Sequence, residues 1–224
     1  MLRRCFAEGV GTFILVFGGT GAIVIDELSG GKITNVGIGI SFGLAVMAAV
    51  YATGHLSGAH INPAVTLGFV IGSHFPRKHV PFYWASQVAG AVIASLTLRG
   101  LFGTVAHLGA TVPNGGSWQS YGLETVLTFI LMFVIMAVAT DTRAVGAAAA
   151  PAIGGTVGLE AVFAGPVSGA SMNPARSLGP ALIGWTWEDH WVYWAGPVTG
   201  AIIASLLYGW LREKGMRDPT DLKA

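Results

Sequence analysis

Charged residues and cysteine are both scarce in this chain. Only 10% of its 224 residues are Asp, Glu, Lys or Arg, whereas soluble domains carry about 25%. The net charge is +1 and no basic tract is present, so nothing indicates a nucleic-acid partner. The single cysteine, Cys5, excludes an intrachain disulfide and a cysteine metal site. What remains is hydrophobic, at 53% of residues, and this composition predicts a membrane protein.

Catalytic and metal-binding signatures are also missing. The sequence has no phosphate-binding loop, no dinucleotide fingerprint and no nucleophile–base constellation, so we expect no enzyme and no cofactor. His55 and His60 lie close together, but a metal site needs more ligands at better spacing, and loop packing is the simpler interpretation. His74 and His79 flank "FPRK", where either a pH-sensitive gate or an ordinary surface fits.

Long apolar runs predict an all-α membrane protein. A membrane-spanning helix needs about 20 mainly apolar residues, and six runs qualify: 7–26, 35–53, 80–99, 121–140, 146–164 and 190–211. The first run is followed by further spans and not by a soluble domain, so we interpret it as a helix and not as a signal peptide. Two shorter runs, 62–72 and 173–184, each begin at Asn-Pro and are typical of re-entrant half-helices.

The chain contains an internal repeat that covers most of its length. "EGVGTFILVF" at 8–17 resembles "ETVLTFILMF" at 124–133, "GHLSGAHINPAVTLG" at 54–68 resembles "GPVSGASMNPARSLG" at 165–179, and "YWASQVAGAVIASL" at 83–96 resembles "YWAGPVTGAIIASL" at 193–206. We therefore predict one channel domain over 1–224, with repeats at about 6–99 and 121–211 and a cytoplasmic tail at 212–224. Three crossings per repeat place the second copy upside down relative to the first.

Small residues indicate where the helices pack closely, and basic residues indicate how the chain is oriented in the membrane. Four small residues within the spans allow close contact between helix backbones: Gly90, Ala94, Gly200 and Ala204. Basic residues concentrate in the cytoplasmic loops of membrane proteins. With a cytoplasmic N-terminus and six spans, the inner side would hold Arg3, Arg4, Arg77, Lys78, Arg143, Arg212, Lys214, Arg217 and Lys223, against Lys32 and Arg99 outside. Both termini are therefore predicted to be cytoplasmic.

The two Asn-Pro segments have the residues that begin a helix. Asn62 and Asn173 suit the N-cap, and Pro63 and Pro174 suit the first helical position. A helix that begins at membrane depth presents unpaired N–H groups and about half a positive charge. In an inverted repeat the two starts meet near the midplane, where neutral carboxamides orient a permeant and the dipoles repel cations.

Arg176 is a charge at membrane depth, three residues past Asn173, whereas Val65 stands at the matching place of the first copy. Such a charge is costly unless it faces water or a partner. One interpretation is that Arg176 lines an aqueous constriction and excludes cations. The other is an ion pair with a buried acid such as Glu160.

Glu8 and Glu124 occupy matched positions near the starts of spans one and four. They could carry protons, but no His or Lys relay accompanies them. We favour a role in which each accepts hydrogen bonds from the N–H groups of a re-entrant loop. Glu160 has no counterpart in the first repeat, and the sequence does not decide whether it braces Arg176, braces a loop or faces a neighbouring helix.

The boxes "SGAHINPAVT" and "SGASMNPARS", the two glutamates and the inverted repeat resemble the aquaporin (major intrinsic protein) family over residues 5–211. The resemblance implies the aquaporin fold and a homotetramer in the lipid bilayer with one pore per subunit. It also implies passive conduction of water or small neutral solutes and exclusion of protons. The family's pore motifs fall on Asn62, Pro63, Ala64, Asn173, Pro174 and Ala175.

The resemblance places a four-residue selectivity filter at Phe42, Ala161, Ala170 and Arg176. Water-specific members carry histidine at the second position and often threonine or cysteine at the third. With two alanines there, the filter should be wider and more apolar than in a strict water channel, unless backbone carbonyls of the outer loop refill the space.

"FAGPVSGASMNPARSLGPA", at 163–181, is similar to the nodulin-like intrinsic proteins of plants and their bacterial relatives. Members pass glycerol, ammonia or neutral metalloid acids such as arsenite. Four positions instead follow the water-channel pattern: Ser177, Ala181, Tyr193 and Trp194. The expected function is a channel for water and such solutes; the alternatives are a strictly water-selective channel and, more distantly, a secondary transporter or a non-conducting junction protein. Short tails favour a prokaryotic plasma membrane.

Overall fold

The computed structural model describes residues 1–140 and 148–212, and within them it is all-helical, as the sequence predicts. Six helices are long and apolar enough to cross a membrane. They are α1 (Leu2–Leu28), α2 (Thr34–Ser57), α4 (Val80–Phe102), α5 (Ser117–Thr140), α6 (Ala149–Ser168) and α8 (Val192–Arg212). The predicted 212–224 tail lies outside the described residues except for Arg212, and so does Arg143.

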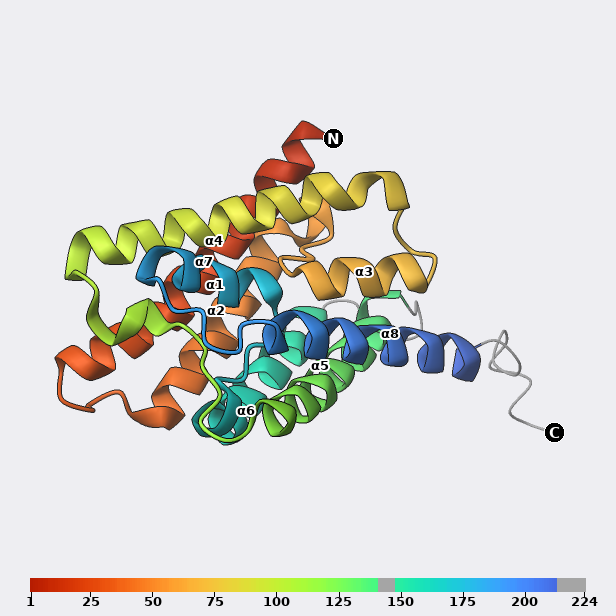
Figure 1. Cartoon of the computed structure of the whole chain (residues 1–224). Helices are drawn as coiled ribbons and strands as arrows, with labels where there is room; N and C mark the ends of the chain where they lie inside the picture. The colour runs from red at the N-terminus through yellow and green to blue at the C-terminus, as the bar shows by residue number, and fades with distance from the viewer. Residues whose placement is uncertain (141–147, 213–224) are drawn as a thin grey trace.

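Two shorter helices begin at the predicted Asn-Pro boxes. They are α3 (Pro63–Ile71) and α7 (Pro174–Gly184), and Figure 1 shows them packed among the long helices. The helix packing crosses between the repeats, because α3 contacts α8 while α7 contacts α4. Short 3-10 turns, η1 (Arg77–His79) and η2 (Val105–Gly109), lie in the connections before and after α4.

Each repeat uses glycine where long helices meet. A Cβ atom on Gly90 of α4 would overlap the carbonyl of Gly9 in α1, and one on Gly200 of α8 would overlap the carbonyl of Thr125 in α5. The close backbone contacts predicted at Gly90 and Gly200 are therefore present. Such contacts are how helices associate in lipid, where the hydrophobic effect gives no driving force between them.

The helix before each box ends in the same way. Gly58 and Gly169 take the left-handed conformation, with φ of 95° and 82°, and each amide N–H returns to the helix, to Gly54 and Gly165 respectively. Glycine adopts this conformation without a Cβ clash. The chain then turns into the bundle and reaches the start of α3 or α7.

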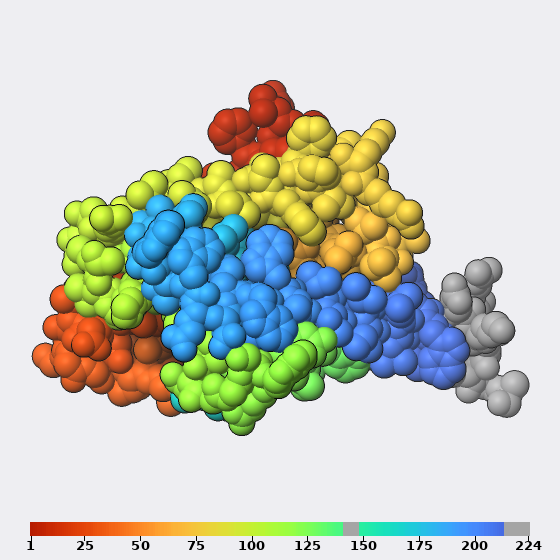
Figure 2. Space-filling view, viewed as in Figure 1, coloured from red at the N-terminus to blue at the C-terminus, as the bar shows by residue number. Residues whose placement is uncertain are grey.

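The surface of the bundle suits a bilayer. Large apolar side chains are exposed on all six long helices, among them Val10, Leu44, Ile93, Ile130, Phe163 and Leu207. The space-filling view shows the N-terminal end of α1 projecting from one edge (Figure 2). Arg3 and Arg4 are exposed on this projection.

Candidate pore

The two asparagines cap the half-helices, as their positions in the sequence predict. The side-chain Oδ1 of Asn62 accepts a hydrogen bond from the amide of Ala64 at 2.8 Å, and Oδ1 of Asn173 accepts one from Ala175 at 3.0 Å. The amide of the next residue in each helix also points at the same oxygen. Two helix N-termini, with their partial positive charge, thus meet inside the bundle.

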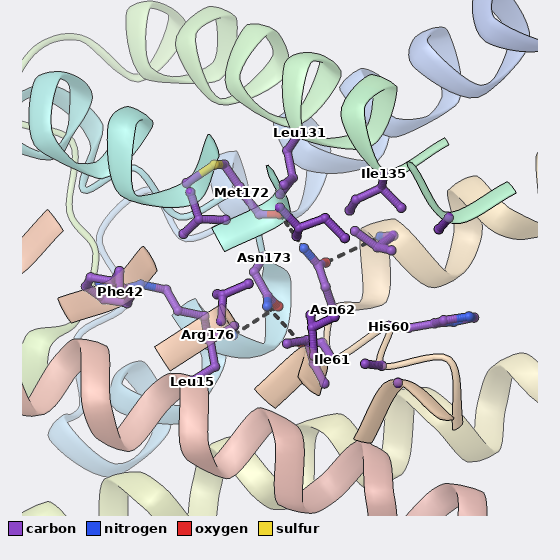
Figure 3. Close-up of a pocket in the computed structure, with 18 of the residues that line it drawn as sticks. Leu15, Phe42, His60, Ile61, Asn62, Leu131, Ile135, Met172, Asn173 and Arg176 are labelled. Carbon is purple, nitrogen blue, oxygen red and sulfur yellow. Dashed lines mark hydrogen bonds between the residues drawn. The ribbon is translucent and has the colours of Figure 1, made fainter. Parts of the chain in front are cut away.

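Each carboxamide also reaches the loop of the other repeat. Asn62 Nδ2 donates to the carbonyl of Met172 at 2.7 Å, and Asn173 Nδ2 donates to the carbonyl of Ile61 at 2.9 Å. An amide nitrogen carries two N–H groups, so these contacts leave one donor on each asparagine for a permeating molecule. The contacts also fix the orientation of both side chains (Figure 3).

A buried carboxyl holds the first re-entrant loop. Glu8 accepts hydrogen bonds from the amides of His60 at 2.9 Å and Ile61 at 2.7 Å, from Ser57 Oγ at 2.7 Å and from Gln87 Nε2 at 2.8 Å. Backbone N–H groups cannot be left unpaired at membrane depth. Glu8 therefore stabilises the irregular loop by accepting hydrogen bonds from backbone N–H groups that would otherwise be unpaired.

Glu124 does the same for the second loop. It accepts hydrogen bonds from the amides of Ser171 at 2.8 Å and Met172 at 2.7 Å and from Ser168 Oγ at 2.8 Å. Tyr193 Oη donates to the carbonyl of Ser168 at 2.8 Å, as Tyr83 does to the equivalent Ser57 at 2.7 Å. Apart from the bond from Gln87 of α4 to Glu8, the hydrogen bonds given above for the two glutamates come from their own loop, and this is the arrangement that we favoured over proton carriage.

A cavity of about 260 Å³ lies beside the two Asn-Pro boxes and is lined by both Asn62 and Asn173. Figure 3 shows Phe42 and Arg176 toward one end, Asn62 and Asn173 at the centre and His60 toward the other end. Aliphatic side chains make up much of the remaining wall: Leu15, Val46, Val50, Val65, Leu131, Ile135, Ile153 and Val157. The cavity is thus amphipathic, with polar groups concentrated on the two re-entrant loops.

The structure brings three of the four expected filter residues to this cavity: Phe42, Ala170 and Arg176. The fourth, Ala161, is buried on α6, one turn beyond Val157, and does not line the cavity.

Arg176 is held from two sides. Its Nη1 donates to the carbonyl of Gly109 at 2.8 Å, and its guanidinium carbon lies 4.8 Å from the centre of the Phe42 ring. That geometry is a cation–π contact. The side chain is only 2% exposed, so this fixed charge is concentrated at one end of the cavity.

No ion pair forms between Arg176 and Glu160. Glu160 is 1% exposed, and in the described part of the chain neither of its carboxyl oxygens has a hydrogen-bond partner. Of the alternatives left open by the sequence, a carboxyl that faces neighbouring helices is the one that this placement fits. Residues 1–140 and 148–212 contain no group of three potential metal ligands among His, Cys, Asp and Glu.

His60 lines the cavity and also packs against three aromatic rings. Its ring lies 4.5 Å from Phe69, 4.7 Å from Phe75 and 5.0 Å from Tyr83, and its Nδ1 is 3.2 Å from Thr66 Oγ1. This placement matches the loop packing that we expected for the histidine before the first box.

Sequence reasoning missed three groups that complete the site: Gln87 beneath Glu8, the Gly109 carbonyl on Arg176, and Thr111, whose hydroxyl reaches α7. The position of Gln87 could have been noticed in the sequence. The letters "YWA" occur in both repeats, but two residues after them the first repeat has Gln87 and the second has Pro197. A backbone carbonyl has no such signal, since every residue carries one.

Comparison with known proteins agrees with the geometry. Residues 1–208 match the family described as Major intrinsic protein. Aquaporin NIP1-4 of Oryza sativa subsp. japonica is 52% identical over 217 residues, which is 96% of this chain and 79% of that one. Aquaporin NIP2-1 of Zea mays is 46% identical over 212 residues, covering 95% and 72%.

A solved structure is similar over its whole length. The aquaglyceroporin from Plasmodium falciparum superposes with a TM-score of 0.85 at 26% identity, covering 100% of this chain and 99% of that one. Sequence and structural similarity to aquaporins thus agree with the architecture, which has six apolar helices, two capped half-helices and a central cavity. The chain belongs to the major intrinsic protein (aquaporin) family, and it is an integral membrane channel for water and small neutral solutes.

Proposed function

We propose that the channel conducts at least one neutral solute larger than water, with glycerol and neutral metalloid acids as the first candidates. The observation that carries the proposal is the lining at the Phe42–Arg176 end. Ala161 is not among the residues that line the cavity, and Ala170, which does line it, contributes only a methyl group. A wide opening with one cation and one aromatic ring admits molecules that have both hydroxyl and C–H surfaces.

The amphipathic wall supports the same solute class. A polyol can donate and accept hydrogen bonds along the re-entrant loops while its C–H side faces Val46, Leu131 and Ile135. Three relatives add to this support, since the similar solved structure is an aquaglyceroporin and the two plant relatives are NIP aquaporins.

Individual roles follow from position. Asn62 and Asn173, with the N-termini of α3 and α7, orient the permeant and repel cations near the midplane. Arg176 and Phe42 form the filter, and the small side chains of Ala161 and Ala170 leave it wide. Glu8 and Glu124 support the loops. Among residues 1–140 and 148–212, those that line the cavity include no cluster of acidic side chains for a coupling ion, which favours passive flux over secondary transport.

We propose a homotetramer in the plasma membrane of a prokaryote, with both termini cytoplasmic. Support for the orientation comes from the clustering of basic groups in the connection that holds His74, Arg77 and Lys78. Burial, and after it the charge of Arg212, lowers the pKa of His74, so Arg212 lies near this connection. The exposed apolar faces of the long helices suit lipid and neighbouring subunits.

Stopped-flow light scattering on proteoliposomes tests the solute. The expected result is fast shrinkage in an impermeant osmolyte and fast re-swelling in glycerol, both well above protein-free vesicles, and arsenite and boric acid would follow. Fast water flux without glycerol re-swelling would refute the wide filter and establish the strictly water-selective alternative. Saturable flux that depends on an ion gradient would instead indicate a transporter.

A further inference from the structure

The segment between α4 and α5 crosses to the filter and adopts an unfavourable backbone there. Three consecutive residues, Ala106, His107 and Leu108, have φ of 46°, 47° and 57°. Residues with a Cβ atom disfavour this left-handed region, so it persists only when surrounding contacts hold it. Gly109 follows directly and supplies the carbonyl that accepts from Arg176.

Contacts on both sides hold this segment in place. Leu108 is fully buried. Beyond Gly109, Thr111 Oγ1 donates to Ser177 Oγ of α7 at 2.7 Å. Asn114 then bonds to α6, through its amide to the carbonyl of Val167 at 3.0 Å and through Nδ2 to that of Pro166 at 2.8 Å.

The Thr111 hydroxyl belongs to a chain of hydrogen bonds that runs in one direction. Ser171 Oγ donates to the carbonyl of Asn173 at 2.9 Å, so the 2.5 Å contact between Ser171 and Ser177 takes its proton from Ser177. Ser177 is then free to accept from Thr111. All of these hydroxyls are at most 5% exposed, and the chain links the outer segment to the box asparagine without an unpaired donor.

Thr111 fits its place by shape as well as by its hydroxyl. A Cβ atom added at Gly169 would lie 2.9 Å from the Thr111 methyl carbon Cγ2. The side chain is therefore enclosed between the second re-entrant loop and α7. Valine would keep this packing and remove only the hydrogen bond, while serine would keep the bond and remove the methyl group.

The repeat shows why a residue of the outer segment is needed here. Thr66, the counterpart of Ser177, accepts a hydrogen bond from Gln87 Nε2 of α4 at 3.0 Å. The counterpart of Gln87 is Pro197, which has no side-chain donor. In the second repeat Thr111 supplies the donor that the helix does not.

We propose that Thr111 and Ser177 are positioning residues that hold the Gly109 carbonyl against Arg176 and so set the solute size limit of the filter. Thr111 lies only two residues from Gly109, so its anchoring restricts where that carbonyl can be. If the Thr111 hydrogen bond is lost, the Gly109 carbonyl can move away from Arg176. The guanidinium then keeps only its contact with Phe42, and the width of the opening varies more. This inference rests on the proposed function, because it concerns the same filter.

The test compares permeability for the tetrol erythritol with that for glycerol, in proteoliposomes of the full chain. Replacement Thr111→Val is expected to raise the erythritol-to-glycerol ratio about two- to fivefold, as loss of one net hydrogen bond would. Thr111→Ser should restore the ratio to near the wild-type value. Thr97→Val is the matched control, because the Thr97 hydroxyl bonds only within its own helix, to Ile93.

Ser177→Ala removes the acceptor of the Thr111 hydrogen bond, on α7. This variant replaces Thr111→Val in the test if Thr111→Val is not recovered in the membrane. The double variant should show no further increase over Ser177→Ala alone, since Ser177→Ala already removes the bond to Thr111 together with the bond to Ser171. An unchanged or lower ratio in variants that still conduct glycerol would overturn the positioning role. A wild-type protein that passes no glycerol would refute the proposed function instead, so the two failures are distinguishable.

Discussion

The two re-entrant segments of this channel, 57–66 and 168–177, are supported alike but differ at one end. Glu8 and Glu124 each bind the serine and two backbone amides of their own loop. Asn62 and Asn173 cap their helices and donate across to the opposite loop. The duplicated part of the sequence thus builds a nearly symmetric centre.

The differences lie at and around the proposed filter. Val65 is replaced by Arg176 in the second copy, and the donor that Gln87 supplies in the first comes from Thr111 of the outer segment in the second. A symmetric fold can therefore select solutes at one mouth only. The comparison teaches that support and selection use separate residues, which mutations can separate.

The largest expected effect comes from removing the shared support. Glu8→Ala or Glu124→Ala would leave at least three buried donors unpaired, at about 1–3 kcal/mol each, against a total stability of about 5–15 kcal/mol. We expect little folded protein from either variant in fluorescence-detected size exclusion after detergent extraction. Glu27→Ala, at an exposed position of α1, is the control, and equal recovery of all three would contradict symmetric support.

Arg176→Val makes the two mouths alike. We expect water and glycerol flux to persist while proton leak rises by at least about tenfold, because about 1.4 kcal/mol of barrier corresponds to a factor of ten. A pH-sensitive dye inside vesicles measures the leak. Arg99→Gln, which removes an exposed charge, should change nothing, and an unaltered leak in Arg176→Val would mean that the half-helix dipoles exclude protons unaided.

Gly19→Ala tests how α1 makes room for the filter. A Cβ atom on Gly19 would overlap the Phe42 ring, so the ring must move, and we expect glycerol permeability to fall severalfold more than water permeability. The residue of the second repeat that corresponds to Gly19 is Ile135, and the Ile135 side chain lines the cavity. Gly100→Ala, where a Cβ meets nothing within 4 Å, is the control; proportional losses would argue against this packing role.

The smallest effect concerns His190, in the connection before α8 at the filter end. Burial lowers the pKa of His190 below its usual value of 6.5, and neither ring nitrogen has a partner in the described part of the chain. The unfolded state therefore takes up the proton first, and stability falls as the pH drops below about 6.5. His190→Gln should reduce the loss of Tm between pH 7.5 and 5.5 by a few degrees; an equal loss would show that other groups cause it.

Most of the architecture could be predicted because it depends on patterns that the chain repeats. The apolar runs at 35–53 and 121–140 lie within helices Thr34–Ser57 and Ser117–Thr140, and the Asn-Pro boxes locate both half-helices. Hydropathy and helix capping act locally, so a single sequence carries them.

What escaped prediction depends on contacts between distant segments. The partner of Arg176 is a backbone carbonyl, and the left-handed turn at 106–108 contains no glycine to announce it. The sequence left the partner of Glu160 undecided, and the structure gives it no hydrogen-bond partner among the described residues. The break in the repeat at Gln87 and Pro197 was the only sequence signal for the missing side-chain donor of the second half, whereas the exchange of Val65 for Arg176 could be read directly.

The most direct test of a wide filter on one side is the glycerol-to-water permeability ratio of Ala161→His against wild type. Under the proposed filter assignment, an imidazole at this position of α6 would occupy space that the alanine methyl group leaves open. The account predicts a ratio lowered by at least about tenfold, within the range that small changes in pocket size produce, while water flux is largely kept. Equal losses of glycerol and water flux would contradict the assignment of Ala161 to the filter.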